Sequence, residues 1–123
     1  MLKPYLIKEK GTKKQILKEN VFSKEAVSVV NEVMQQVVSN PSGTAHAANI
    51  SGVTLRGKTG TAEIKQSQTD TKGTELGWFV SILPKTNDKD ALELVSMTED
   101  VKKRGGSGYV VRKTKTIIEQ YLQ

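Results

Sequence analysis

The chain has 123 residues, no cysteine and a formal charge of +6. This length suits one domain of ordinary size, and the lack of cysteine excludes a disulfide framework, a thiolate metal site and a cysteine nucleophile. No apolar run approaches the ~20 residues that span a bilayer, and the N-terminus lacks the apolar core of a signal peptide. As written, the chain is expected to be soluble, without a signal or transmembrane segment.

The excess positive charge is concentrated in residues 1–24, which contain seven lysines and two glutamates. Nucleic-acid binding is one explanation of such a charge. Aromatic residues make up only 5% of the chain, however, which is too few for a platform on which bases stack. A solvated lysine-rich segment explains the charge better, so we expect no nucleic-acid partner.

The first residues of the chain contain two short apolar runs flanked by lysines, at 4–8 and 15–18. Gly11-Thr12-Lys13 lies between them and is typical of a turn. The pattern therefore predicts an N-terminal hairpin within residues 1–22.

A helix is predicted over residues 24–39. Ser23 is a suitable N-cap, and Asn40-Pro41-Ser42-Gly43 ends the helical pattern. Apolar side chains recur at helical spacing and form one stripe, which we expect to be buried: Val27, Val30, Met34, Val37 and Val38.

Three segments rich in β-forming residues follow, near 53–63, 76–83 and 91–98. The second is nearly continuous apolar sequence, which favours a central buried strand with Trp78 in the core. A final helix is predicted near 108–121. Because the connections between the strands are short, we expect an antiparallel sheet packed by helices, which is an α+β fold.

The segment from Gly52 to Thr61 supports two different chemistries. Its first eight residues have the spelling G-x-x-x-x-G-K-[ST] of a phosphate-binding P-loop. A P-loop also needs a buried strand before the first glycine and a helix that starts at the lysine. The small polar residues at 44–51 and the Thr-Gly-Thr after Lys58 meet neither requirement, so a small nucleotide-binding protein is the weaker interpretation.

The second chemistry is acyl transfer on a strand. In Lys58-Thr59-Gly60-Thr61, strand alternation places Lys58 and Gly60 on one face and the two threonines on the other. A glycine removes a side chain where another backbone approaches, and nearby hydroxyl and ammonium groups suit a substrate carboxylate. A backbone N–H of such a strand can also donate to a developing oxyanion.

Lys58-Thr59-Gly60 resembles the K-T-G motif of the penicillin-binding proteins and serine β-lactamases. The similarity extends to the segments 57–63, 77–80, 34–38 and 43–45. Essentially the whole chain is similar to the C-terminal part of the transpeptidase domain of a class B penicillin-binding protein.

The resemblance implies a role for each residue of the motif. Lys58 would orient the substrate and support the proton network around the active-site serines. The hydroxyls of Thr59 and Thr61 would bind the carboxylate of the peptide or of a β-lactam, and the backbone N–H of Thr61 would supply half of the oxyanion hole. Gly60 would keep the strand clear for substrate. No metal ion and no cofactor are expected.

The other two motifs of the family are absent from the sequence. No serine before Lys58 has a lysine three positions later, and none has an asparagine two positions later, so S-x-x-K and S-x-N are both missing. Without the nucleophilic serine no acyl-enzyme forms. We therefore expect residues 1–123 to be one partial domain of a peptidoglycan D,D-transpeptidase that is inactive by itself.

The resemblance also implies partners and a location. In the intact parent the ligand would be a peptidoglycan stem peptide or a β-lactam, and the parent would be a membrane-anchored, extracytoplasmic bacterial protein. The chain would pair with the missing N-terminal part of its domain, or self-associate through the surfaces which that part covers. A penicillin-sensor domain of a signalling receptor is an alternative on the same fold.

Overall fold

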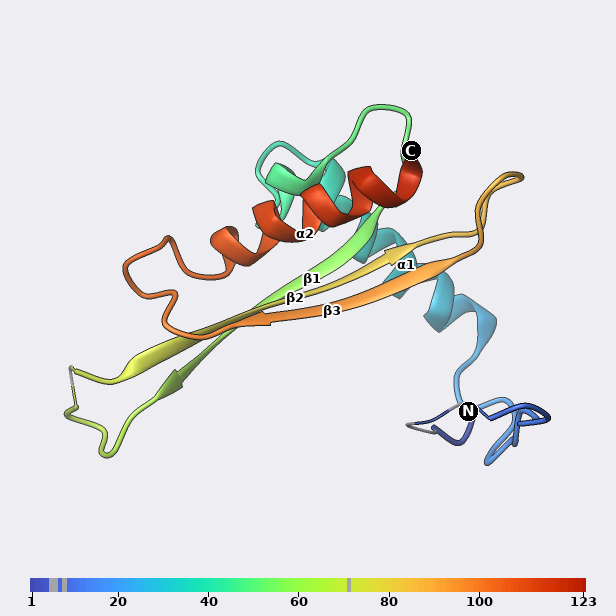
Figure 1. Ribbon diagram of the computed structural model, residues 1–123, viewed down its shortest axis with the longest axis horizontal. Coiled ribbons are helices and arrows are strands. Elements are labelled where there is room, and N and C mark those ends of the chain that lie inside the picture. Colours follow the sequence, from blue (N-terminus) through green and yellow to red (C-terminus); the bar gives the residue numbers. More distant parts are fainter. Residues whose placement is uncertain (5–6, 8, 71) are drawn as a thin grey trace. The chain divides into compact units, whose positions relative to one another are not determined.

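A computed structural model describes residues 1–4, 7, 9–70 and 72–123 of the chain. These residues form two compact units, Met1–Val30 and Asn31–Gln123. The second unit contains a three-stranded sheet and the helix that packs on it (Figure 1).

In place of the predicted hairpin strands, the described part of the first unit contains a single antiparallel bridge. Leu2 pairs with Ile16, and in the turn between them the N–H of Thr12 donates to the carbonyl of Glu9 at 3.0 Å. Leu2 and Ile16 remain 52% and 60% exposed, so the pairing buries no apolar face that would extend it into strands. Part of the predicted run at 4–8 lies outside the described residues.

Helix α1 (Lys24–Ser39) has the predicted bounds. The Ser23 hydroxyl caps it by accepting a backbone N–H of the first turn at 3.1 Å. The predicted burial of its apolar stripe is wrong for the first half, because Val38 is buried whereas Val27 and Val30 are 46% and 56% exposed. Helical spacing decides which side chains share a face, but burial also requires an element packed against that face.

The second unit has the predicted α+β fold with an antiparallel sheet, in which the strand order is β1-β2-β3. The bounds are β1 Arg56–Ile64, β2 Thr74–Leu83, β3 Leu92–Thr98 and α2 Ser107–Leu122, with a short 3₁₀ helix η1 at His46–Ala48. The first strand begins later than the predicted residue 53. The chain turns at Gly52, which has a φ of 76°, before it extends into β1.

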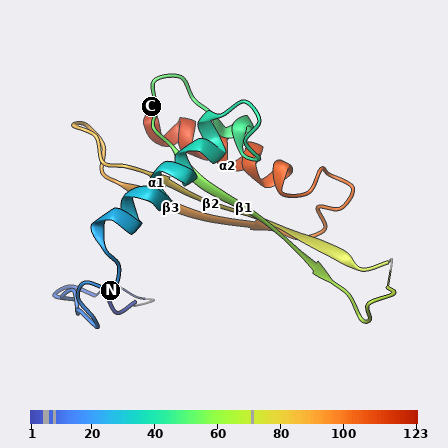
Figure 2. The same cartoon turned by 180° about the vertical axis from the view of Figure 1, so that it is seen from behind.

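Helix α2 lies across one face of the sheet, toward which β2 directs alternate residues. Gly77, Phe79 and Leu83 are buried on this face, and a Cβ at Gly77 would lie only 2.9 Å from Val110 of the helix. Glycine at this position therefore allows the close approach of α2. Figures 1 and 2 show the β1–β2 hairpin projecting beyond the start of α2. Within the described ranges, no helix is long and apolar enough to cross a membrane.

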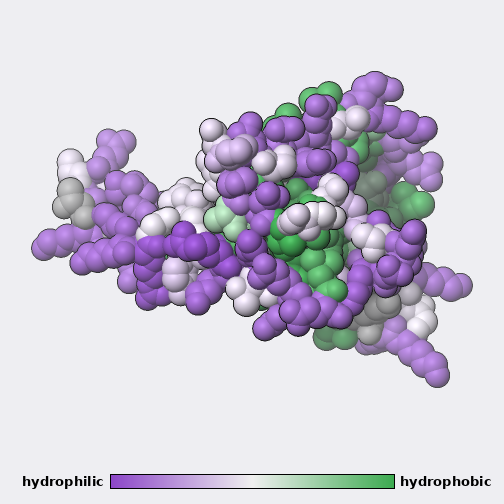
Figure 3. Space-filling model, turned by 90° about the horizontal axis from the view of Figure 1, so that it is seen from above, coloured by the Kyte–Doolittle hydropathy of each residue, from purple (hydrophilic) through white to green (hydrophobic). Residues whose placement is uncertain are grey.

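The opposite face of the sheet is more open than the sequence predicts. Cross-strand pairing places Trp78 beside Met97 and Val80 beside Val95, and we call these four residues the open sheet face. Trp78 and Val80 are half-buried, while Val95 and Met97 are 62% and 45% exposed. Trp78 is thus not the fully buried core residue that was predicted. Hydrophobic residues (green) also reach the surface between hydrophilic ones (purple) on the side drawn in Figure 3.

Candidate functional site

The predicted site residues lie near the middle of β1, at one edge of the sheet. Among the described strands β1 pairs only with β2, so its other edge carries no strand. Lys58 and Thr61 are exposed, whereas Thr59 and Gly60 are half-buried. Lys58 lies opposite Val80 of β2, which puts its side chain on the side of the open sheet face. The four residues are therefore consecutive on an accessible edge strand.

Two side-chain hydrogen bonds organise this strand. The Lys58 ammonium donates to the carbonyl oxygen of Thr59 at 2.5 Å. The hydroxyl oxygens of Thr59 and Thr44 lie 3.0 Å apart and share a hydrogen bond. Thr44 belongs to a loop without any periodic pattern, so no spacing signal in the sequence points to its contact with the site.

The loop that carries Thr44 is tied to the end of α1. The Nδ1 atom of His46 lies 3.0 Å from the carbonyl oxygen of Val38, and the N–H of Ala45 donates to Val37 at 3.1 Å. A Cβ at Gly43 would lie 2.3 Å from the Val37 carbonyl oxygen, so only glycine fits beside the helix end. These contacts hold the loop in the position that brings Thr44 to Thr59.

The carboxylate nearest in sequence to the motif does not pair with its lysine. Glu63 instead forms an ion pair with Lys65, with 2.5 Å between Oε2 and Nζ. The hydrogen bond from Lys65 lowers the pKa of Glu63 and raises the pKa of Lys65, so both groups are charged at neutral pH. The ion pairs of the described residues do not include Lys58, so its positive charge is uncompensated there.

Two glycines of β1 differ in how much space surrounds them. A Cβ at Gly57 would lie 2.6 Å from the Phe79 ring and 3.2 Å from Val38, so packing within the chain requires this glycine. A Cβ at Gly60 would meet only the Cβ of Trp78, at an ordinary 3.5 Å. Packing of the described residues therefore does not explain the glycine at position 60, and the space there is open to a ligand.

The structure contradicts the P-loop interpretation of Gly52 to Thr59. Lys58 lies in the middle of a strand that pairs with β2, whereas a P-loop lysine stands at the start of a helix. From Arg56 onward the backbone of this segment pairs with β2 and so does not form a loop that could wrap a phosphate. The spacer residues Val-Thr-Leu-Arg lead into the strand and do not form a phosphate-binding loop.

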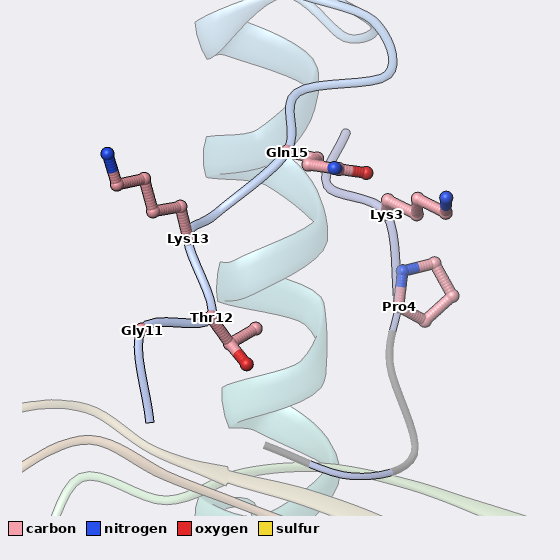
Figure 4. A pocket seen from close by; sticks show the side chains of 6 residues that line it. All are labelled: Lys3, Pro4, Gly11, Thr12, Lys13 and Gln15. Carbon is pink, nitrogen blue, oxygen red and sulfur yellow. The ribbon is translucent and has the colours of Figure 1, made fainter. Parts of the chain in front are cut away.

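A cavity of about 430 Å³ lies in the first unit, and none of the predicted site residues lines it (Figure 4). Its walls come from two nearby stretches of chain, residues 3–4 and 11–15. It combines two lysines with neutral polar and backbone groups, and no predicted catalytic residue lines it. This cavity therefore contributes nothing to the candidate site on β1.

Comparison with known proteins identifies the class to which this fold and this strand belong. Residues 1–119 match the family described as the penicillin binding protein transpeptidase domain. The chain therefore belongs to the penicillin-binding protein transpeptidase family.

Two individual proteins illustrate the relationship. The chain is 39% identical over 115 residues to penicillin-binding protein 3 of Bacillus subtilis (strain 168). The matched region covers 94% of the chain but only 17% of that relative. The apo transpeptidase domain of Burkholderia pseudomallei penicillin-binding protein 3 is similar in fold, with a TM-score of 0.56 and 23% identity. This match covers 81% of the chain and 31% of the solved chain.

Proposed function

We propose that β1 is the substrate-binding strand of a peptidoglycan D,D-transpeptidase that also binds penicillin. The observation that carries the proposal is the open space at Gly60, on an edge strand whose neighbours supply an ammonium and two hydroxyl groups. An extended peptide can pair with the free edge of such a strand, while side chains on either face recognise its ends. The membership of the chain in the transpeptidase family supports this assignment.

Each residue of the motif has a distinct role in the proposal. The Lys58 ammonium attracts the substrate carboxylate and supports the proton network of the active-site serines. To do so, it gives up its hydrogen bond to the Thr59 carbonyl oxygen. The hydroxyls of Thr59 and Thr61 hydrogen-bond the carboxylate, and Thr44 orients the first of them. The backbone N–H of Thr61 supplies half of the oxyanion hole, where it stabilises the negative charge of the tetrahedral intermediate.

The chain by itself does not carry out this reaction. Acyl transfer by this family needs a nucleophilic serine and its lysine, and S-x-x-K is absent before Lys58. Substrate binding without a nucleophile produces no acyl-enzyme. The catalytic cycle therefore requires the part of a transpeptidase domain that carries the first two motifs, in a parent that we propose to be membrane-anchored and extracytoplasmic.

The open sheet face supports the proposal that this chain pairs with the part of a transpeptidase domain that carries the first two motifs. Exposed apolar residues such as Val95 and Met97 are costly in water, and covering them stabilises the chain. Self-association of the chain is the alternative way to cover this face. The penicillin-sensor domain is a second candidate function, but Thr61-Ala62-Glu63 continues the motif as in the class B transpeptidases and favours the enzyme.

A chimera tests the proposal. The matching segment of the Bacillus subtilis relative is replaced by this chain, and covalent labelling by fluorescent penicillin is measured. We expect the chimera to be labelled, and Lys58→Ala or Thr59→Val to lower the labelling rate at least about tenfold, since each removes a contact to the carboxylate. Lys72→Ala and Thr69→Val, in the exposed β1–β2 loop, serve as matched controls. Undiminished labelling in both site variants would contradict the assigned roles.

A further inference from the structure

A second cavity lies at the start of β1, where the loop before this strand meets the end of β2 and the end of α2. It has a volume of about 350 Å³, within the roughly 300–1,000 Å³ of small-molecule sites. Arg56 is the first residue of β1 and lines this cavity. It precedes Lys58 by two residues on the same face, about 7 Å along the strand.

One atom of the half-buried Arg56 side chain lacks a hydrogen-bond partner. Its Nε atom is buried, and no described residue supplies a hydrogen-bond acceptor for it. None of the ion pairs of the described residues includes the guanidinium either. A buried charged donor is normally paired, because leaving it unsatisfied forfeits its hydration without compensation. The Nε–H of Arg56 is therefore available to an acceptor that the described residues do not supply.

The charges around the cavity define the acceptor. Lys85 also lines it, but the ammonium of Lys85 is already paired with Asp90 at 3.1 Å. Among the residues that line the cavity, Arg56 is therefore the cation without an ion pair to a described residue. A carboxylate carries one compensating charge, and its two oxygens match the fork of a guanidinium. Thr54 and Thr86 line the same cavity. The Thr86 hydroxyl oxygen accepts the N–H of Lys89 at 3.1 Å, and its O–H remains able to donate to an anion.

The remaining wall of the cavity is apolar. Val53 from the loop, Leu83 from the end of β2 and Leu122 from the end of α2 contribute to it. Such a wall suits a hydrocarbon group, whose burial adds to the binding of the charged end. We propose that this cavity is a binding site for a small monocarboxylate with an apolar body, held by the Arg56 guanidinium. The site is separate from the substrate-binding role proposed for Lys58 to Thr61.

Binding is tested by NMR titration of the full chain with hexanoate as the probe. We expect saturable shifts of the backbone amides of Gly52, Thr54 and Thr86 and of the Arg56 Nε–H. Hexanamide has the same hydrocarbon body without the charge, and we expect it to leave these signals unmoved. Inorganic phosphate has the charge without the apolar body, so we expect it to bind at least tenfold more weakly.

Three variants test the role of the guanidinium. We expect Arg56→Gln to weaken hexanoate binding at least tenfold and Arg56→Lys to retain part of it. Arg112→Gln changes an exposed arginine of α2 and should leave the affinity unchanged. The proposal is overturned by shifts that do not saturate, by equal responses to hexanoate and hexanamide, or by an unchanged affinity in Arg56→Gln. If Arg56→Gln fails to fold, the comparison of hexanoate, hexanamide and phosphate and the affinity of Arg56→Lys for hexanoate still test the proposal. Since no readout involves penicillin, failure here is distinguishable from failure of the chimera.

Discussion

The two glycines of β1 that differ in their surroundings have different uses. Gly57 is enclosed by Phe79 and Val38, whereas Gly60 faces open space apart from an ordinary contact with Trp78. The first glycine therefore serves packing, and the second is free to serve ligand approach. The segment 57–63, which is similar to the family, thus contains one glycine with a structural role and one that is open to a functional role.

Alanine at each of these positions separates the two uses. We expect Gly57→Ala to lower the free energy of unfolding by about 1–3 kcal/mol, because the added methyl group overpacks the core. Gly60→Ala should change it by less than about 1 kcal/mol. Urea denaturation followed by circular dichroism measures both values. Equal destabilisation by the two substitutions would contradict the distinction.

Two buried hydroxyl groups also differ in their partners. Thr114 of α2 donates to the Ser96 hydroxyl of β3 at 2.8 Å, so the hydrogen bond links the helix to the sheet. The Ser81 hydroxyl is buried without a partner among the described residues. The first group stabilises the fold through a satisfied hydrogen bond, whereas the second loses its hydration without compensation.

We predict opposite consequences when these hydroxyls are removed. Thr114→Val should lower the free energy of unfolding by about 1–2 kcal/mol, since it leaves the Ser96 hydroxyl without its donor. Ser81→Ala should be neutral within about 0.5 kcal/mol or stabilising. The same urea experiment compares them, and a larger loss for Ser81→Ala than for Thr114→Val would refute the prediction.

At the scale of elements, the β1–β2 connection depends on one carboxylate. Asp70 accepts hydrogen bonds from the backbone N–H groups of Gln66 at 3.2 Å, Lys72 at 2.8 Å and Gly73 at 3.1 Å. The hydrogen bond from Gln66, followed by that from Lys72, lowers the pKa of Asp70 below its ordinary value of 3.8. The ionised form of Asp70 thus orders the connection between the two strands.

This lowered pKa predicts an acid-sensitive loop. The stabilisation is complete above the ordinary pKa of 3.8 and is lost as the pH falls through the lower pKa of the folded state. We expect the amide signals of Lys72 and Gly73 to move toward random-coil shifts in an NMR titration from about pH 6 to about pH 2. Asp70→Asn removes the titrating charge and serves as the control. The prediction fails if these amides respond equally in the variant.

The elements predicted from the sequence are those with the strongest local signals. The capped helix at 24–39 and the three β-rich segments followed from spacing and composition, and the structure confirms them within a few residues. The exposure of Val27 and the incomplete burial of Trp78 did not follow, because a periodic pattern does not specify what packs against it. The role of Thr44 and the cavity at Arg56 depend on loops brought together by the fold, which no local spacing reveals.

At the scale of the whole molecule, we expect the open sheet face to govern association. Val95 is 62% exposed on this face, which is a large exposure for a strand valine. We expect the purified chain to self-associate at high concentration in light scattering, and Val95→Lys to shift it toward the monomer by placing a charge on the face. Thr116→Lys, at an exposed position of α2, is the control. A sharp monomer peak for the unmodified chain at all concentrations would contradict this expectation.

The central claim is that the chain carries the substrate-binding strand of a transpeptidase but no nucleophile. Incubation of the purified chain with fluorescent penicillin, followed by denaturing gel electrophoresis, tests it most directly. The intact Bacillus subtilis relative and the chimera are run beside it as positive controls. We predict a covalent label on the controls and none on the chain alone, because no serine of an S-x-x-K motif is present to be acylated. Stoichiometric labelling of the chain alone would contradict the account.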